Sequence, residues 1–327
     1  MASTANSDPQ KSEIPYRTLG HTGEKISCIG MGGYHLGKKE LTEAEAINLV
    51  RSGVDRGINF LDNSWDYNNG ESEKRVGKAV KDGSLRSHVF LMTKNDGRTK
   101  EEFNRQLHES LNRLQTDHVD LMQFHEIIRF EDPDRIFAEG GAAEAALEAK
   151  KAGKLRYIGF TGHKDPNIHL YMLKVAEAHK FLLDTVQMPI NVMDYHFRSF
   201  THQVLPELTK RNIGVIGMKS IGDSVILKSG VVTALECLQF SLSRPVSVQV
   251  TGIDKPEFLD QAIKAAQTYD KVSKEKMGEI LNRTKTKAME GNWELFKTSA
   301  LFDSTAQHPE WLGGTSPHVK SVQPHMS

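Results

Sequence analysis

Short apolar runs alternate with amphipathic segments of helix length along most of this chain. The runs are rich in β-branched and aromatic residues, and in chain order they read CIGMGG, INFLD, VFLMTK, VDLMQF, YIGFTG, TVQMP, GVIGMK and VSVQVTG. Runs of this kind, separated by helical segments, are typical of parallel strands joined by crossovers. Together they predict an α/β fold, a (β/α)8 TIM barrel, which takes about 250 residues. A doubly wound sheet of similar length is the structural alternative.

The ends of the helical segments carry regular signals. Thr42 and Thr99 each precede a glutamate by three residues, which is the capping-box spacing, and Asp165-Pro166 fits a capped helix start. Three segments, DRGINFLD, KAGKLRYIGF and KRNIGVIGM, combine a basic last turn, a Gly or Asn and a following apolar strand. These repeated helix-to-strand junctions favour right-handed crossovers between parallel strands.

The regions outside the repeated pattern are short. Gly20 and Gly23 bracket a turn between two extended runs, which predicts a small β-hairpin before the first barrel strand. Because no Pro- or Ser-rich linker divides the chain, we expect one barrel domain over residues 16–289, closed by an extra helix in KVSKEKMGEILNRTKTKAM. Residues 1–15 are polar and expected to be disordered. Residues 290–327 form an irregular, aromatic C-terminal tail that we expect to pack on the barrel.

Composition excludes several classes of function. The 42 Lys and Arg residues balance the 42 Asp and Glu residues, so no charge excess favours nucleic acid or an anionic membrane as a partner. Cys28 and Cys237 are the only cysteines, too few for a disulfide framework. No apolar run approaches the roughly 18 residues that span a bilayer, and the start lacks a secretory signal. We therefore expect a cytoplasmic globular protein, and the sequence sets no oligomeric state.

Two glycine- or histidine-containing motifs fall short of known signatures. Gly30-Met31-Gly32-Gly33 begins like a dinucleotide-binding fingerprint, but His35 stands where the third glycine belongs. HEIIR, which begins at His125, differs from the zinc motif HExxH by Arg129, and the fourteen histidines offer no other plausible zinc set. Neither a GxSxG elbow nor a P-loop appears. The sequence thus predicts no metal site and gives no support to a hydrolase or nucleotidase.

Polar residues follow three successive apolar runs. Asp62, Lys94 and His125 each stand directly after one run, and Tyr67 lies five residues beyond Asp62. If the runs are neighbouring parallel strands, these side chains meet at the carboxyl-terminal edge of the barrel, where barrel enzymes carry out catalysis. Each residue alone is more often a cap or a packed side chain. An acid, an amine, an imidazole and a phenol in this order indicate a site for proton transfer.

From about residue 16 to residue 267, the chain resembles the aldo-keto reductase family. The matching features are the hairpin, GMGGYHLG, the block FLDNSWDYNNGESEKRVGKAV, the strand ends MTK and QFH, and the strand with Gln187. The resemblance implies a (β/α)8 barrel that binds NADP(H) without a Rossmann domain. It also implies that Asp62, Tyr67, Lys94 and His125 form a catalytic tetrad that reduces an aldehyde or ketone.

Each member of this tetrad has an expected role. Tyr67 would donate the proton, and the ammonium of Lys94 would lower the pKa of this weak acid from about 10. Asp62 would hold Lys94 charged and oriented. His125 would donate a hydrogen bond to the substrate oxygen.

The resemblance also suggests binding residues. The candidates for the cofactor are Gly32, Gly33, Thr161, Gln187, Met218, Lys219, Gly252, Asp254, Lys255 and Gln261. The candidates for the substrate pocket are Tyr34, Trp293, Phe296 and Phe302, because relatives use the chain after the eighth helix as a pocket wall.

Several positions depart from the family pattern. The fifth strand ends in Thr161-Gly162-His163 instead of Ser-Asn, and Met218 replaces a tyrosine that stacks on the nicotinamide. Gly252 and Phe258 stand where NADP-dependent members carry Lys and Arg, which leaves Lys255 as the nearby basic residue. NAD is therefore the alternative cofactor. The alternative functions are an NAD-dependent alcohol or sugar dehydrogenase and a non-catalytic, cofactor-binding regulatory subunit.

Overall fold

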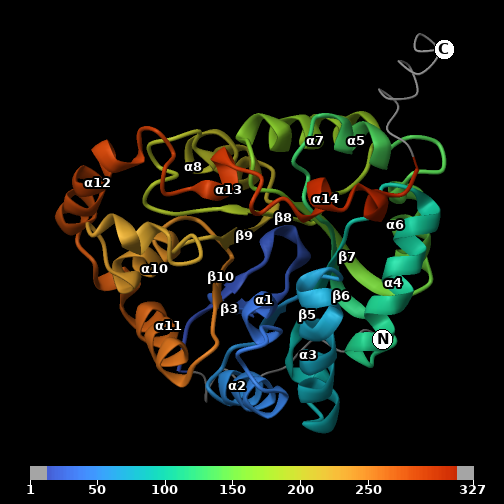
Figure 1. Cartoon of the computed structure of the whole chain (residues 1–327), viewed down its shortest axis with the longest axis horizontal. Helices are drawn as coiled ribbons and strands as arrows, with labels where there is room; N and C mark the ends of the chain where they lie inside the picture. The colour runs from blue at the N-terminus through green and yellow to red at the C-terminus, as the bar shows by residue number, and fades with distance from the viewer. Residues whose placement is uncertain (1–12, 315–327) are drawn as a thin grey trace.

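Eight parallel strands close into a barrel in the computed structural model, which describes residues 13–314 (Figure 1). The strands are β3 (Ile29–Gly32), β4 (Phe60–Asp62), β5 (Phe90–Asn95), β6 (Val119–Phe124), β7 (Leu155–Thr161), β8 (Thr185–Pro189), β9 (Gly214–Met218) and β10 (Val248–Gly252). They correspond to the eight predicted runs. The doubly wound alternative is wrong, because β10 pairs in parallel with β3 and closes the sheet. Of residues 1–15, for which disorder is expected, residues 1–12 lie outside the described residues, as does the tail after residue 314. Within the described part, Ile14 is buried in the apolar core.

Helices surround this barrel. The longer ones are α2 (Glu43–Asp55), α3 (Glu71–Asp82), α4 (Lys100–Leu114), α6 (Ala142–Lys151), α7 (Pro166–Ala178), α10 (Ala234–Leu242), α11 (Pro256–Thr268) and α12 (Lys274–Ala288). The short ones are α1 (Gly33–Leu36), α5 (Glu131–Ile136), α8 (Phe200–Gln203), α9 (Leu205–Lys210), α13 (Leu295–Thr298) and α14 (Ser304–Gln307). Single 3-10 turns are η1 (Gly20–Thr22), η2 (Tyr67–Gly70), η3 (Arg86–His88), η4 (Ile226–Ser229), η5 (Tyr269–Lys271) and η6 (Pro309–Leu312). Within residues 13–314, none of these helices has the length and apolar character needed to cross a membrane.

The predicted helix starts are largely as expected. Thr42 makes both bonds of a capping box with Glu45, and Asp165 accepts a hydrogen bond from the backbone N–H of Asn167. At α4 only half of the box forms: Thr99 accepts from the Glu102 backbone N–H. The carboxylate of Glu102 instead turns to Arg105 and Gln106 one turn along the same helix.

A β-hairpin closes the amino-terminal end of the barrel. Strands β1 (Tyr16–Thr18) and β2 (Lys25–Ser27) pair antiparallel, as the sequence predicts. The side chains of Leu19, which follows β1, and of Ile26 in β2 join the apolar interior of the barrel. Gly20 has a φ of +50°, and a Cβ there would lie 2.3 Å from the backbone nitrogen of Gly214. Only glycine allows the hairpin to approach this closely. The barrel therefore opens at its carboxyl-terminal end.

The chain after α12 crosses back over this open end (Figure 1). The backbone N–H of Arg98, in the loop after β5, donates to the carbonyl of Leu312 at 2.8 Å, and Arg135 donates to the carbonyl of Gly313 at 2.6 Å. On the opposite side, Glu294 accepts a hydrogen bond from Asn191 after β8 at 3.0 Å. The tail thus spans the mouth from β8 to β5 and is attached to the barrel loops at both ends.

A buried lysine attaches the first part of the tail. Lys297 Nζ lies 2.7 Å from Asp194 Oδ1 and 3.0 Å from Glu294 Oε2, and it also donates to the carbonyl oxygen of Phe197. All three charged side chains are shielded from solvent. Burial raises the pKa of Glu294, against the opposing effect of Lys297. The cation therefore balances two carboxyl groups that have no access to water.

Removing this cation should destabilise the protein. Lys297→Ala leaves Asp194 and Glu294 buried without their counter-ion, a change that typically costs about 3–5 kcal/mol. Urea unfolding followed by circular dichroism measures the loss. The matched control is Lys276→Ala, which removes an exposed lysine from surface ion pairs with Glu236 and Glu279 and should change stability by less than about 1 kcal/mol. Equal losses in the two variants would contradict a structural role for the buried ion pairs.

Candidate active site

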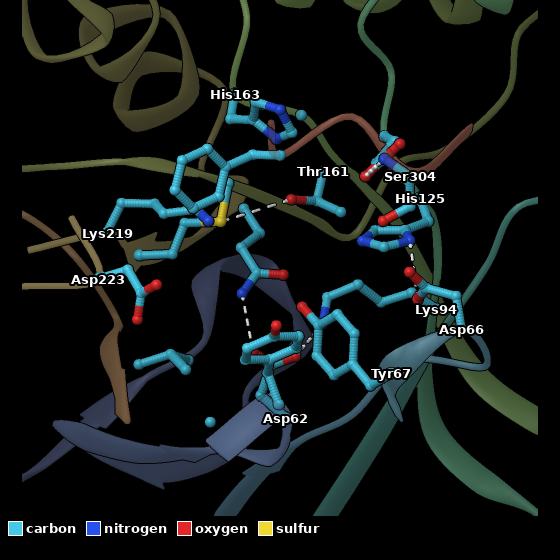
Figure 2. A pocket seen from close by; sticks show the side chains of 18 of the residues that line it. Asp62, Asp66, Tyr67, Lys94, His125, Thr161, His163, Lys219, Asp223 and Ser304 are labelled. Carbon is cyan, nitrogen blue, oxygen red and sulfur yellow. Dashed lines mark hydrogen bonds and ion pairs between the residues drawn. The ribbon is translucent and has the colours of Figure 1, made fainter. Parts of the chain in front are cut away.

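The four residues predicted as a tetrad lie together at the carboxyl-terminal end of the barrel (Figure 2). Asp62 is the last residue of β4, Lys94 lies near the end of β5, His125 directly follows β6, and Tyr67 begins η2. They line a cavity of about 500 Å³. The parallel strands bring the ends of β4, β5 and β6 to the same edge, so residues far apart in the sequence share this cavity.

Lys94 is at the centre of the hydrogen bonds in this group. Its Nζ donates to Asp62 Oδ1 at 2.5 Å, to the carbonyl oxygen of Asn63 at 2.7 Å and to Tyr67 Oη at 3.1 Å. The other oxygen of Asp62 accepts from Gln187 Nε2 at 3.1 Å. Lys94 is only 1% exposed, so these contacts replace its hydration. The arrangement fixes the phenol oxygen of Tyr67 beside a cation.

The pKa of Tyr67 differs from the expectation. Burial raises the pKa of this phenol well above 10, and the negative charges of Asp62, Asp66 and Glu126 raise it further. The prediction that Lys94 gives a net lowering of the Tyr67 pKa is therefore wrong. Tyr67 keeps its proton at neutral pH, and the Lys94 ammonium is placed to stabilise the oxygen if that proton leaves.

His125 reaches the cavity from a polar cluster that the sequence did not reveal. Its Nδ1 atom lies 2.9 Å from Asp96 Oδ1, 3.2 Å from Ser64 Oγ and 3.4 Å from Asp66 Oδ1. Figure 2 shows the ring with one nitrogen toward Asp66 and the other toward the cavity. Burial lowers the pKa of His125, which favours a neutral ring. Asp66 directly precedes Tyr67, and Asp96 lies two residues after Lys94. This proximity to the tetrad was the one signal in the sequence that could have identified them.

The proposed cofactor residues divide into two groups. The cavity is lined by Gly32, Thr161, Gln187, Met218, Lys219 and Gly252. The remaining candidates, Gly33, Asp254, Lys255 and Gln261, do not line it. Lys255 is exposed at the start of α11, and the buried Gly33 begins α1.

Gln187 supplies the test of whether a nicotinamide fits. Its Nε2 is used by Asp62, whereas its buried Oε1 has no hydrogen-bond partner among the described residues. An unpartnered buried carbonyl oxygen is costly, and the N–H group of a carboxamide would satisfy it. Thr161 lines the same wall, with Oγ1 at 3.9 Å from the sulfur of Met218. The residues present therefore fit a nicotinamide ring in this part of the cavity.

His163, which follows the fifth barrel strand, makes its contacts with the tail. Its Nε2 lies 2.9 Å from Asp303 Oδ1, and Lys164 Nζ lies 2.7 Å from the other oxygen of Asp303. His163 lines the cavity, but its ring is held by the tail. In this structure it is therefore a contact between the fifth strand end and the tail.

The tail contributes a different set of residues from the predicted one. Tyr34 and Phe302 line the cavity as expected. Trp293 and Phe296 do not: Trp293 packs against the apolar cluster beside α12, and the buried ring of Phe296 lies next to Phe302 at 6.3 Å between centroids. Their place is taken by residues with no periodic pattern in the sequence, namely Leu301, Ser304, Gln307, His308 and Trp311.

Glu126 attaches this wall to the residue next to His125. Its Oε1 accepts a hydrogen bond from the Ser304 backbone N–H at 2.9 Å. Its Oε2 accepts from both the backbone N–H and the hydroxyl of Thr305 at 2.7 Å. The glutamate of the HEIIR segment thus binds the start of α14 through both of its carboxylate oxygens. One carboxylate couples the position of the tail to the loop that carries His125.

The comparisons with known proteins agree with this geometry. The model of the aldo/keto reductase family matches residues 28–231, which is more than half of the chain. The chain belongs to the aldo/keto reductase family, a family of oxidoreductases.

Individual relatives support the assignment. L-galactose dehydrogenase of Arabidopsis thaliana is 31% identical over 229 residues, which cover 67% of this chain and 69% of that protein. Aldo-keto reductase YhdN of Bacillus subtilis is 32% identical over 206 residues, covering 59% of this chain and 58% of the relative. The holo structure of aldo-keto reductase AKR11C1 from Bacillus halodurans shares the fold, with a TM-score of 0.68 and 22% identity over 83% of this chain and 96% of that chain.

Loosening the tail should affect substrate binding more than cofactor binding. Glu126→Gln replaces a charged acceptor by a neutral one and weakens bonds to Ser304 and Thr305, each worth about 1.5–3 kcal/mol when charged. We expect a higher KM for the carbonyl substrate and an almost unchanged Kd for the cofactor, measured by steady-state kinetics and fluorescence titration. Glu290→Gln, on an exposed tail residue, is the control. An unchanged KM in the Glu126 variant would show that the contact between Glu126 and the tail does not affect substrate binding.

Proposed function

We propose that this protein reduces an aldehyde or ketone to the alcohol with NADPH, and that Tyr67 donates the proton. The observation that carries the proposal is the contact of the Tyr67 phenol with the buried Lys94 ammonium, itself paired to Asp62. A carbonyl reduction needs a hydride on carbon and a proton on oxygen. A bound nicotinamide cofactor supplies the hydride, and the protein provides orientation and the acid.

The protonation of the site favours the reductive direction. Because its pKa is raised, Tyr67 holds a proton at neutral pH and can deliver it from Oη to a carbonyl oxygen. Lys94, 3.1 Å away, then stabilises the phenolate, while Asp62 keeps the ammonium in place. Alcohol oxidation would require a deprotonated Tyr67 first. At neutral pH, this form is rare.

Cofactor choice rests on few residues. Gln187 and Thr161, which line the cavity, would hold the carboxamide of a nicotinamide, and Met218, on the same cavity wall, would cover its face. Aldo-keto reductases usually bind NADP, and Lys255 at the start of α11 offers a cation for the additional phosphate. This lysine is exposed and lies outside the cavity, so it would act on the far end of the dinucleotide.

A sugar dehydrogenase is the second candidate. One relative is named as an L-galactose dehydrogenase, and the mouth of the cavity carries the polar residues Asp223, Ser304, Gln307 and His308. A polyhydroxylated substrate would find hydrogen-bond partners there. Comparing kcat/KM for reduction and oxidation over simple aldehydes and free sugars separates the two candidates. Tight cofactor binding without any turnover would instead favour the non-catalytic role.

Tyr67→Phe tests the proton donor. The variant keeps the ring and its packing but removes the acid, and the reduction rate should fall by about 10²-fold or more, the scale of general acid catalysis. Steady-state assays give kcat, and fluorescence titration should show unchanged cofactor affinity. Tyr34→Phe removes the other phenol that lines the cavity and should leave kcat near the wild-type value. If the Tyr67 variant retained most of its kcat, this residue could not be the donor.

Lys255→Ala tests the preference for NADP. A charge-assisted hydrogen bond to phosphate is worth about 1.5–3 kcal/mol, so NADPH should bind about tenfold more weakly while NADH is almost unaffected. Calorimetric titration of both cofactors provides the measurement. Lys264→Ala, an exposed lysine further along α11, is the matched control. Equal losses for the two cofactors, or a wild-type preference for NADH, would overturn the assignment.

A further inference from the structure

Two carboxyl groups and one hydroxyl surround a single nitrogen of His125. Asp96 Oδ1 lies within hydrogen-bond distance of Nδ1, and Asp66 Oδ1 lies 3.4 Å away. Asp96 is fully buried, and the Asp66 side chain is 5% exposed. Among the described residues, Asp66 Oδ1 and Asp96 Oδ2 accept no hydrogen bond. Two unsatisfied anions beside a neutral ring are unfavourable, and one additional proton would relieve this.

The position of that proton determines what His125 can do. A neutral imidazole carries one N–H, and the hydrogen bond at one nitrogen decides which nitrogen is protonated. If Asp96 is a carboxylate, Nδ1 donates to it, and Nε2 is left without a proton. If Asp96 is a carboxylic acid, Asp96 donates to Nδ1, and Nε2 carries the proton. Only the second arrangement gives a neutral His125 that can donate a hydrogen bond into the cavity.

We propose that Asp96 is a positioning residue that sets the tautomer of His125: as a carboxylic acid it donates to Nδ1 and keeps the proton on Nε2, facing the cavity. The inference rests on the proposed carbonyl reduction, in which His125 donates to the substrate oxygen. The arrangement requires one proton on the Asp96 carboxyl group and no extra proton on the His125 ring, which stays neutral.

The backbone of the loop after β5 holds Asp96 in this position. Its N–H donates to Gln106 Oε1 at 2.7 Å, and its carbonyl accepts from Arg98 Nη1 at 2.9 Å. The backbone N–H of His125 donates to the carbonyl of Asn95 at 2.9 Å. These bonds fix the Asp96 carboxyl and the His125 ring relative to each other from both adjacent loops. The contact between them does not depend on a flexible side chain reaching across solvent.

The charges around the two groups permit the acid form near neutral pH. Burial raises the pKa of Asp96 to about 7, because it outweighs the opposing charges of Arg98 and Lys94; Asp132 and Glu102 act in the same direction as burial. The pKa of His125 is lowered, and the largest cause is burial, which disfavours the charged ring.

The charges that face His125 do not reverse this effect. Asp66 and Glu126 favour the imidazolium, whereas Lys94 and Arg98 oppose it. Below a pH of about 7, Asp96 is therefore protonated beside a neutral ring. As the pH rises through 7, Asp96 loses its proton, Nδ1 becomes the donor, and Nε2 can no longer donate. The reduction rate should fall over the same range, whereas Tyr67, with its raised pKa, remains protonated.

Asp96→Asn and Asp96→Leu separate this role from a purely structural one. The asparagine amide donates to Nδ1 at every pH, so the variant should retain reductase activity and lose the alkaline decline in kcat/KM. Leucine fills similar space without a donor and should lower kcat by about 10²-fold, the scale for loss of one donor to a developing oxyanion. Asp66→Asn is the matched control and should keep the alkaline decline, because Asp66 Oδ1 makes no hydrogen bond to His125 in the structure. An asparagine variant as impaired as the leucine variant would overturn the proposal.

Nitrogen NMR reads the tautomer without any turnover. Histidine labelled with ¹⁵N is incorporated, and the ring signals are assigned by their loss in His125→Gln. The wild type should show a proton on Nε2 near about pH 6 and on Nδ1 near about pH 8, while Asp96→Asn keeps it on Nε2 at both. An Nδ1 proton near pH 6 contradicts the proposal. A protein that reduces no carbonyl but shows these tautomers would contradict the proposed function alone.

A bound divalent cation is the competing arrangement. Asp66, Asp96 and His125 present three atoms of ligand type within 4.8 Å of one another. Atomic emission of the purified protein, before and after dialysis against a chelator, detects such an ion. Stoichiometric metal that is lost in Asp96→Asn would overturn the tautomer proposal. A metal-free protein with the expected NMR signals would support it.

Discussion

A lysine ammonium buried at the carboxyl-terminal end of the barrel is the constraint on which this site depends. Moving an ammonium out of water costs several kcal/mol, so Lys94 requires close polar partners. Asp62 and Asn63 supply them from the end of β4. Asp62 pairs with Met92 across the β4–β5 ladder, and Lys94 lies two residues further on the same face. A slip of one residue between β4 and β5 would turn these side chains to opposite faces. The contact between Asp62 and Lys94 therefore depends on the register of the barrel.

The surroundings of the cavity are rich in carboxyl groups. Asp66 and Glu126 lie near Tyr67 in addition to Asp62, and their charges oppose ionisation of the phenol. A low dielectric strengthens each of these effects because water does not screen them. The site therefore retains protons. This property suits an acid that must be ready before the substrate arrives, and it explains why Lys94 alone does not determine the charge state of Tyr67.

The sequence predicted site residues best where a polar residue stands at the end of a periodic apolar run. Asp62, Lys94 and His125 each end an apolar run, so parallel strands alone bring them together. Asp96 and Glu126 were missed because their importance comes from burial in loops, which have no period to read. The tail shows the same limit: Trp293 and Phe296 are as aromatic as Phe302, yet local turns direct only Phe302 into the cavity. The direction of the Tyr67 pKa shift could not be predicted either, because it depends first on burial and then on carboxylates that come from several loops.

The attachment of the tail to Glu126 also bears on how the enzyme is made. All four tetrad residues lie within the first 125 positions, whereas Ser304 and Trp311, which help to wall the cavity, come from the end of the described chain. A ribosome therefore releases the complete proton-transfer group long before it releases the segment that covers it. A prematurely terminated chain would carry the reactive residues without their wall. The wall of the cavity therefore depends on a segment that is far from the tetrad in the sequence and reaches it only in the folded barrel.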